Sequence, residues 1–315
     1  MNPLSAIFAA GVAVRNALYD RGIFKTRRLA RPVVSVGNIS VGGSGKTPFV
    51  IALGELLKER GIAFDVLSRG YGRQSAAVAV VVPEGSPQQF GDEPLLIARK
   101  LQVPVIVGSD RYQAGLLAEQ KFSSQLHILD DGFQHRRLHR DFDIVMLPAA
   151  DITDTLLPVG RLREPGSALR RADAMVVDEP DAETELQGLS AKLWRIRREL
   201  EVDDVAGCGT AFCGIARARQ FFFQLPGAKV PLVGTLAFPD HHRYSQADIE
   251  HLLQLKAARK ADFLVTTEKD EINLGALAQR LQPLHIARLN LRLEDPANAL
   301  DHLLRTLEQR CGCRF

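Results

Sequence analysis

The sequence predicts an α/β protein with a parallel sheet that helices cover on both faces. Short apolar runs alternate with helical patterns between residues 33 and 177, which is the chain order of a parallel sheet. A glycine-rich loop follows the first run directly, and a second, shorter alternation begins near residue 207. With 315 residues, 46% of them hydrophobic, the chain can bury a core of this kind.

The first alternation is expected to form the larger part of the fold. Its strands are the apolar runs at 33–36, 64–67, 103–107, 127–129, 144–147 and 174–177. Its helices are the stretches at 49–60, 93–101 and 110–121. Parallel strands of this kind place the loops that follow them at one common edge of the sheet.

A change of texture separates the second alternation from the first. Residues 178–181 are acidic and turn-prone, and 192–198 reads as an isolated ribbon strand, so we expect a linker there. Strands are then expected at 212–215, 230–236, 263–266 and 286–291, with helices at 218–225, 246–260 and 297–309. The predicted organisation is a basic N-terminal segment, a larger lobe, a ribbon linker and a smaller α/β lobe, at 1–31, 32–180, 181–206 and 207–315.

The N-terminal segment combines an apolar stretch with a basic flank. Residues 1–37 hold six basic residues and one acidic residue, a net charge of +5 against +3 for the whole chain. Ahead of this flank, Leu4, Ile7, Phe8 and Val12 recur at helical spacing. The apolar stretch is shorter than the roughly 20 residues that cross a bilayer, and a secretory signal would carry its positive charge first. A helix on an anionic membrane surface and a helix packed on the protein's own core both remain open.

Residues 37–48 form a phosphate-binding loop. They read Gly-Asn-Ile-Ser-Val-Gly-Gly-Ser-Gly-Lys-Thr-Pro and directly follow the apolar run at 33–36. Backbone N–H groups freed by the glycines can wrap a polyphosphate, the Lys46 ammonium adds charge, and the Thr47 hydroxyl can bind Mg²⁺. Ser40 stands where the general pattern has glycine. The expected nucleotide contacts are Ser40, Val41, Gly42, Gly43, Ser44, Gly45, Lys46 and Thr47.

Further polar groups follow the other expected strands. Asp130 and Asp131 come after the run at 127–129, the arrangement in which an acid holds magnesium; either can be the ligand, and an ordinary Asp-Gly turn is the alternative. The basic loop at 68–73 could bind phosphate or stay solvated, and Asp92 could simply cap the helix behind it. The Asp-His-His run at 240–242 favours acid–base chemistry or helix capping over a metal site, because no third ligand has supporting spacing.

The four cysteines show neither the density of a disulfide framework nor convincing zinc spacing. Their usage fits a reducing cytoplasm.

Taken together, these segments resemble the tetraacyldisaccharide 4'-kinases of lipid A biosynthesis. The matching strings are Val-Gly-Asn-Ile-Ser-Val-Gly-Gly-Ser-Gly-Lys-Thr-Pro (36–48), Ser-Arg-Gly-Tyr-Gly (68–72), Gly-Asp-Glu-Pro (91–94), Asp-Asp-Gly-Phe-Gln-His (130–135), Leu-Pro-Val-Gly-Arg-Leu-Arg-Glu-Pro (157–165), Phe-Pro-Asp-His-His (238–242) and Thr-Thr-Glu-Lys-Asp (266–270). They occur in the family's order along most of the chain. The family also accepts Ser at the position of Ser40.

The resemblance implies transfer of the ATP γ-phosphate to the 4'-hydroxyl of a tetraacylated glucosamine disaccharide 1-phosphate, with Mg²⁺. It implies a P-loop NTPase-like sheet, two α/β/α lobes joined by a β-ribbon, and an active site in the cleft between them. The expected place of work is the cytoplasmic face of a Gram-negative inner membrane. Attachment there would be peripheral, without a spanning helix, and neither nucleic acid nor an obligate protein partner is expected.

The resemblance also assigns roles to individual residues. Asp92 and His241 look like the catalytic pair, with Asp92 as the base toward the sugar hydroxyl and His241 supporting it. Asp130 and Asp131 look like the magnesium and active-site acids, with Asp131 counted among the catalytic residues and Thr47 as a further magnesium ligand. The acceptor-side group is Arg69, Arg111, His135, Arg163 and Glu164.

The alternative is a membrane-associated ATPase or GTPase switch. A switch of the chromosome-partitioning type needs a second lysine just before the paired glycines, where Val41 stands. A GTP-binding switch could use 266–270 as its base-reading segment, but the expected asparagine is missing. Nucleotide turnover with and without a lipid disaccharide separates the two classes.

Overall fold

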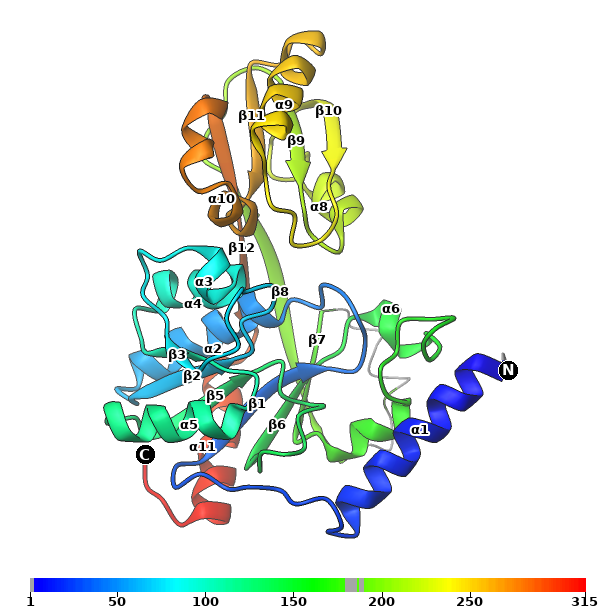
Figure 1. Ribbon diagram of the computed structural model, residues 1–315, viewed down its shortest axis with the longest axis vertical. Coiled ribbons are helices and arrows are strands. Elements are labelled where there is room, and N and C mark those ends of the chain that lie inside the picture. Colours follow the sequence, from blue (N-terminus) through cyan, green and yellow to red (C-terminus); the bar gives the residue numbers. More distant parts are fainter. Residues whose placement is uncertain (1–2, 179–185, 187–189) are drawn as a thin grey trace.

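The computed structural model describes residues 3–178, 186 and 190–315. Figure 1 shows two bodies joined by a long two-stranded ribbon. We call the body built on β1–β7 the first lobe and the body built on β9–β11 the second lobe. The predicted boundary between residues 180 and 181, and most of the acidic stretch at 178–181, lie outside the described residues.

The first lobe has a parallel sheet with β1 at its centre. The sheet order is β7-β6-β1-β5-β2-β4-β3, and only the two-residue edge strand β3 runs antiparallel to its neighbour. Because β5 and β6 flank β1, the loops that follow these three strands meet at one edge. The strands are β1 (Val33–Asn38), β2 (Phe64–Ser68), β3 (Ala79–Val80), β4 (Val105–Val107), β5 (Leu126–Asp130), β6 (Phe142–Met146) and β7 (Ala174–Val177).

Helices cover both faces of this sheet, as the alternation predicts. Alternate side chains of β1 show the two faces: Val34 and Val36 belong to the core under α2 and α4, whereas Val33 packs with residues of α5. All are fully buried, which is why these strands read as continuous apolar runs. The helices of this region are α2 (Lys46–Glu59), α3 (Pro87–Phe90), α4 (Asp92–Leu101), α5 (Arg111–Lys121), α6 (Ala149–Ile152) and the 3₁₀ helix η1 (Gly166–Arg171).

The second lobe repeats this design on a smaller scale. Its parallel strands β9 (Gly209–Cys213), β10 (Leu232–Ala237) and β11 (Phe263–Thr267) lie in the order β10-β9-β11. Two apolar clusters, one on each face, hold its helices. The helices are α8 (Ala218–Gln224), α9 (Gln246–Ala258), α10 (Glu268–Leu274) and the 3₁₀ helix η2 (Gly275–Leu281).

The ribbon consists of β8 (Lys192–Glu201) and β12 (Leu284–Leu293). The expectation of an isolated strand at 192–198 was wrong. The start of β8 pairs with β7 and its remainder pairs antiparallel with β12, whose own start pairs with β11. Trp194 and Ile196 anchor the ribbon in the core of the first lobe. The sheet therefore runs without a break from one lobe to the other.

The last helix, α11 (Pro296–Cys311), packs on the first lobe and not on the second, where its place in the sequence had suggested it. Leu300, Leu303 and Leu307 join the core beneath α2 and β1, and the Arg310 guanidinium bonds to the carboxylate of Asp173 at 2.6 Å. Figure 1 shows this helix, in red, beside the first lobe. The chain thus leaves the first lobe through β8 and returns to it through β12.

Helix α1 (Pro3–Asp20) is attached by polar contacts and keeps apolar side chains in solvent. Ser5 donates to the Leu156 carbonyl at 3.1 Å, and the Asn16 amide donates to Glu164 at 2.9 Å. Leu4 and Ile7 are 59% and 70% exposed. Within the described ranges, no helix has both the length and the apolar character needed to cross a bilayer.

Candidate active site

The phosphate-binding loop connects β1 to α2 at the centre of the first sheet. Gly42 and Gly45 have φ values of 98° and 86°, which glycine adopts without strain. Helix α2 begins at Lys46, three residues earlier than the sequence suggested, because Gly45 already serves as its N-cap. The Lys46 ammonium lies 3.1 Å from Asn38 Oδ1 and 3.4 Å from Asp131 Oδ1, so it points toward the ends of β1 and β5.

Ser40 has a structural reason to replace the usual glycine. Its hydroxyl donates to Asp151, a fully buried carboxylate. Arg161 of the first lobe and Arg217 of the second lobe also contact Asp151, at 3.1 and 3.3 Å. One buried carboxylate thus links the phosphate loop to both lobes.

A cavity of about 970 Å³ opens between the lobes. All eight predicted nucleotide contacts, residues 40–47, line it, together with Asp130, Asp131 and His241. Apolar side chains also line it, among them Ile51 of α2 and Leu289 of β12. A cavity of this size, with both polar and apolar lining, can hold a nucleoside triphosphate.

Asp130, the last residue of β5, and Asp131, which follows it, differ in their electrostatic environment. Burial, together with the carboxylates of Glu93 and Asp131, raises the pKa of Asp130. Burial also opposes ionisation of Asp131, but Lys46 and Arg163, at 3.4 and 3.0 Å, outweigh it and hold the pKa of Asp131 well below its usual range. Asp131 has a φ of 51°, a left-handed conformation that aspartate adopts more readily than most residues.

This pair of acids fits a magnesium ion. Burial, and after it the charges of Glu93 and Asp131, raise the pKa of Asp130, and a bound dication would favour its ionised form. The described residues contain no group of three or more His, Cys, Asp or Glu side chains arranged to hold a metal. Mg²⁺ in nucleotide sites takes one or two carboxylates and fills its shell with phosphate and water, so Asp130, Asp131 and Thr47 can supply its protein ligands.

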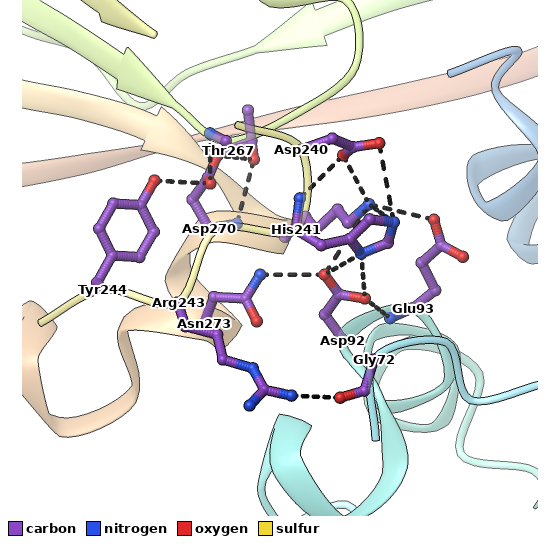
Figure 2. Close-up of polar contacts among 12 residues, drawn as sticks. Gly72, Asp92, Glu93, Asp240, His241, Arg243, Tyr244, Thr267, Asp270 and Asn273 are labelled. Atoms are coloured by element: carbon purple, nitrogen blue, oxygen red, sulfur yellow. Dashed lines mark hydrogen bonds and ion pairs between the residues drawn. The ribbon is translucent and has the colours of Figure 1, made fainter. Parts of the chain in front are cut away.

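Asp92 and His241 meet across the two lobes, although 149 residues separate them (Figure 2). Asp92 begins α4, and its carboxylate lies 2.9 Å from His241 Nδ1 and 3.0 Å from the Asn273 amide. Burial would raise the pKa of Asp92, but the hydrogen bond from His241 and the charge of Lys269 lower it to about 2. His241 lines the cavity, and the nearly buried Asp92 lies behind it.

His241 is held in a strained conformation by its surroundings. Its φ is 58°, and its N–H donates to the Gly214 carbonyl at 3.0 Å. The Asp270 carboxylate fixes both neighbouring segments, because it accepts hydrogen bonds from the Gly214 N–H at 2.7 Å and the Tyr244 hydroxyl at 2.8 Å. Figure 2 shows Asp270 beneath the loop that carries His241. Strain of this kind is concentrated at functional sites.

A second cavity, of about 730 Å³, lies between the first lobe and α1. Arg69, Arg111, His135 and Arg163 line it, and Arg69, Arg163 and Asp131 also line the first cavity. The two cavities therefore meet at Asp131.

The second cavity carries an excess of positive charge. Arg111 is buried, and within the described part of the chain no carboxylate lies within ion-pair distance of it. Burial and the neighbouring Arg69 lower the pKa of Arg111, while burial and Arg111 lower the pKa of His135 to about 4. Arg111 donates to the Ser109 carbonyl at 2.9 Å, but no carboxylate of the described residues balances its charge. A buried charge of this kind is costly, so this cavity favours an anionic ligand.

Glu164 differs from the other expected acceptor contacts. Its carboxylate receives Arg171 at 2.9 and 3.0 Å and Asn16 at 2.9 Å. Among the described residues, it is not part of the lining of either cavity. Its contacts hold α1 against the first lobe.

Sequence reasoning missed several residues of the site. Lys269 and Asn273 of α10 contact the Asp92–His241 pair, and Arg198 of β8 donates to the Ser44 carbonyl at 3.3 Å. The string at 266–270 drew attention to Lys269, but a seven-residue helix gives no periodicity from which to place its side chain.

Comparison with known proteins gives one consistent result. The profile of the tetraacyldisaccharide-1-P 4'-kinase family matches residues 1–308. A tetraacyldisaccharide 4'-kinase of Koribacter versatilis is 51% identical over 322 residues, covering 99% of this chain and all of the relative, and one of Aquifex aeolicus is 39% identical, covering 86% and 88%. A crystal structure of LpxK from Aquifex aeolicus in complex with ATP superimposes with a TM-score of 0.80 at 35% identity, over 96% of this chain and 97% of the other.

Proposed function

This chain belongs to the tetraacyldisaccharide-1-P 4'-kinase family, and on that premise we propose how its residues share the work. It is an ATP-dependent kinase that phosphorylates the 4'-hydroxyl of a tetraacyldisaccharide 1-phosphate in lipid A biosynthesis. The observation that carries the proposed roles is that the two cavities meet at Asp131, one lined by the phosphate loop and the other lined mainly by arginines. The nucleotide switch considered from the sequence is not favoured.

The phosphate loop binds the ATP phosphates. Backbone N–H groups of residues 42–47 face the phosphate oxygens, and Lys46 lies beside the β- and γ-phosphates. Thr47, Asp130 and Asp131 are the residues that would hold Mg²⁺, which neutralises charge on the phosphates when bound. Arg163 keeps Asp131 ionised and oriented, because both its terminal nitrogens contact that carboxylate.

Asp92 accepts the proton of the 4'-hydroxyl as that oxygen bonds to the γ-phosphorus and the bond from phosphorus to the ADP oxygen breaks. Its low pKa makes it a weak base, which suffices in a loose transition state, because the hydroxyl becomes acidic only as its new bond forms. His241 orients the carboxylate through Nδ1. The Asp92 carboxylate already accepts hydrogen bonds from His241 and Asn273. The acceptor hydroxyl must therefore replace one of these donors when it binds to Asp92.

The acceptor disaccharide occupies the second cavity. Arg69, Arg111, His135 and Arg163 supply donors for its phosphate and hydroxyl groups, and the shared lining at Asp131 lets its 4'-end reach the γ-phosphate. Glu164 supports this cavity indirectly, through Asn16 of α1 and through Arg171.

Helix α1 attaches the enzyme to the membrane that contains the acceptor. Its exposed Leu4, Ile7 and Val14 offer an apolar face, and the basic residues that follow favour anionic lipid. We place the protein at the cytoplasmic face of the inner membrane as a peripheral enzyme, because acyl chains keep the acceptor in the bilayer. The second cavity borders α1 at Arg15 and Tyr19, which brings the acceptor site next to the membrane.

Transfer of ³²P from γ-labelled ATP to a purified tetraacyldisaccharide 1-phosphate tests this assignment. The expected product is a lipid bisphosphate, formed by the wild-type protein and about 10²-fold more slowly by Asp92→Asn. ATP hydrolysis that proceeds at full rate without the acceptor, with no label in the lipid, would return the protein to the switch class.

A further inference from the structure

Lys269 occupies the centre of the active-site network, yet none of the roles proposed above uses it. It lies in the first turn of α10, and its ammonium group contacts residues of both lobes. Nζ is 3.2 Å from Glu93 Oε1 and 3.9 Å from Asp92 Oδ2 in the first lobe. In the second lobe it is 3.5 Å from Asp240 Oδ1 and 3.3 Å from His241 Nε2.

Two groups lie near Nε2 of His241. The Lys269 ammonium is within hydrogen-bond distance at 3.3 Å, whereas Oδ2 of Asp240 is farther away, at 3.8 Å. A lysine ammonium has three donors and no acceptor, so in this hydrogen bond Nε2 accepts and carries no proton. A neutral imidazole with a bare Nε2 holds its proton on Nδ1. Nδ1 is the atom that lies 2.9 Å from the Asp92 carboxylate, so it donates to that carboxylate. The Lys269 contact thus selects the tautomer that the pair needs.

The charges around Lys269 keep it in the donor form. Burial disfavours the ammonium, but the carboxylates of Glu93, Asp92 and Asp240 outweigh that effect and raise the pKa of Lys269. Its side chain is 16% exposed, so solvent screens these contacts only weakly. At neutral pH the group stays charged.

The same charges act on His241 with opposing signs. Burial lowers the pKa of His241, but the hydrogen bond from Asp92 and the carboxylates of Asp92 and Asp240 outweigh it and raise the pKa, while the Lys269 charge opposes that rise. The other groups that face the ring or its loop are Glu93 on α4, the Tyr71 ring at 4.8 Å and Arg243, which donates to the Gly72 carbonyl. Lys269 is thus the cation in direct contact with the ring that resists its protonation.

We propose that Lys269 is a positioning residue: its ammonium occupies His241 Nε2, keeps the imidazole neutral with the proton on Nδ1, and so directs that proton to Asp92. The inference rests on the proposed roles of Asp92 and His241. It explains why His241 has its proton on Nδ1. It also makes this proton position depend on Lys269, a residue of α10 in the second lobe. Without Lys269, the surrounding carboxylates stabilise the protonated ring, which takes its second proton from solvent.

The test compares Lys269→Met, Lys269→Arg and the control Lys256→Met in the full chain. Lys256 lies in the same lobe, and its ammonium donates to the Gln282 carbonyl. For Lys269→Met we expect kcat to fall about tenfold or more while the KM for ATP stays within about twofold. The acid limb of its kcat–pH profile should move to higher pH by about one unit, because a cation that suppressed His241 protonation is gone. Lys269→Arg should restore the limb, and Lys256→Met should match the wild type.

A second readout does not depend on turnover. In protein labelled with ¹⁵N-histidine, with His241→Gln used to identify the signals, wild-type His241 should show a bare Nε2 and a protonated Nδ1. Lys269→Met should show both nitrogens protonated at a pH where the wild type is neutral. An unchanged protonation state, or an acid limb that stays in place, overturns the role of Lys269. Full activity in Asp92→Asn would instead overturn the proposed catalytic pair, so the two failures are distinct.

Discussion

The phosphate loop and the Asp92–His241 pair reach the same cavity by different routes. The loop is one continuous segment between β1 and α2, and Lys46 contacts Asn38 only eight residues away. The Asp92–His241 pair joins residues 149 positions apart, from two lobes held together by the ribbon of β8 and β12. The loop can therefore keep its shape when the lobes move, whereas the pair exists only in one arrangement of them.

The largest effect on turnover should come from a change in the phosphate loop. Lys46→Ala removes the charge that we place beside the transferred phosphate, so we expect turnover to fall about 10³-fold. Removing the ammonium also leaves Asp131 with Arg163 as its remaining ion-pair partner among the described residues. Initial rates with saturating acceptor measure the loss. Near-wild-type turnover of this variant would contradict the assignment of Lys46 to the nucleotide site.

A change in the Asp92–His241 pair should affect the chemical step and leave nucleotide binding nearly unchanged. Asp92→Asn cannot accept a proton but keeps the size of the side chain, so kcat should fall about 10²-fold while the ATP dissociation constant changes little. Equilibrium binding of ATP and single-turnover transfer distinguish the two quantities. A lost ATP affinity with unchanged kcat would show that Asp92 serves the nucleotide and that the two routes are not independent.

A subtler way to disturb the pair acts through its support. At Gly214, an added Cβ would lie 2.8 Å from His242 Cβ and 3.0 Å from the Pro239 carbonyl, so Gly214→Ala must shift the loop that carries His241. We expect kcat to fall about tenfold with ATP binding preserved, since a displacement of this size affects alignment and not the phosphate loop. Gly166→Ala is the matched control, because open space surrounds that position. Equal effects of the two changes would exclude the alignment argument.

The smallest effect on turnover is expected from a change in membrane attachment, which involves neither the phosphate loop nor the Asp92–His241 pair. Ile7→Asp places a charge on the exposed face of α1, and loss of a side chain worth about 1.5–3 kcal/mol should lower partitioning to anionic vesicles about tenfold or more. Turnover of a detergent-dispersed acceptor should stay near normal. Phe223→Asp changes an equally apolar side chain, 86% exposed on α8, and should leave partitioning unchanged. Release by the Phe223 change alone would move the membrane face to the second lobe.

Features built from one continuous segment could be predicted from the sequence, and features built from distant segments could not. The position of the phosphate loop was predictable, because its glycines, Lys46 and Thr47 are consecutive in the sequence and stand between a strand and a helix. The strands of the first sheet were predictable because each is buried on both faces and reads as a continuous apolar run.

Features that depend on distant segments were not predictable in this way. Asp92 begins a helix and reads as an ordinary cap, so only resemblance to a family marked it for catalysis. Lys269 and Asn273 lie on a short helix without periodicity, and their value comes from contact with a residue of the other lobe. The pairing of β8 with both β7 and β12 joins segments that lie far apart in the sequence. The same is true of the packing of α11 on the first lobe. Local sequence patterns do not predict such contacts.

The return of α11 also has a consequence for how the protein is made. The helix supplies Leu300, Leu303 and Leu307 to the core beneath the phosphate loop's own strand, yet the ribosome makes it after the entire second lobe. During synthesis, part of the apolar face of the first sheet therefore stays uncovered until residues 207–295 have been made and α11 follows. Partly built chains with exposed apolar surface are what chaperones bind. A nascent chain halted before residue 296 should accordingly remain chaperone-bound and fail to retain ATP, although its phosphate loop is already complete.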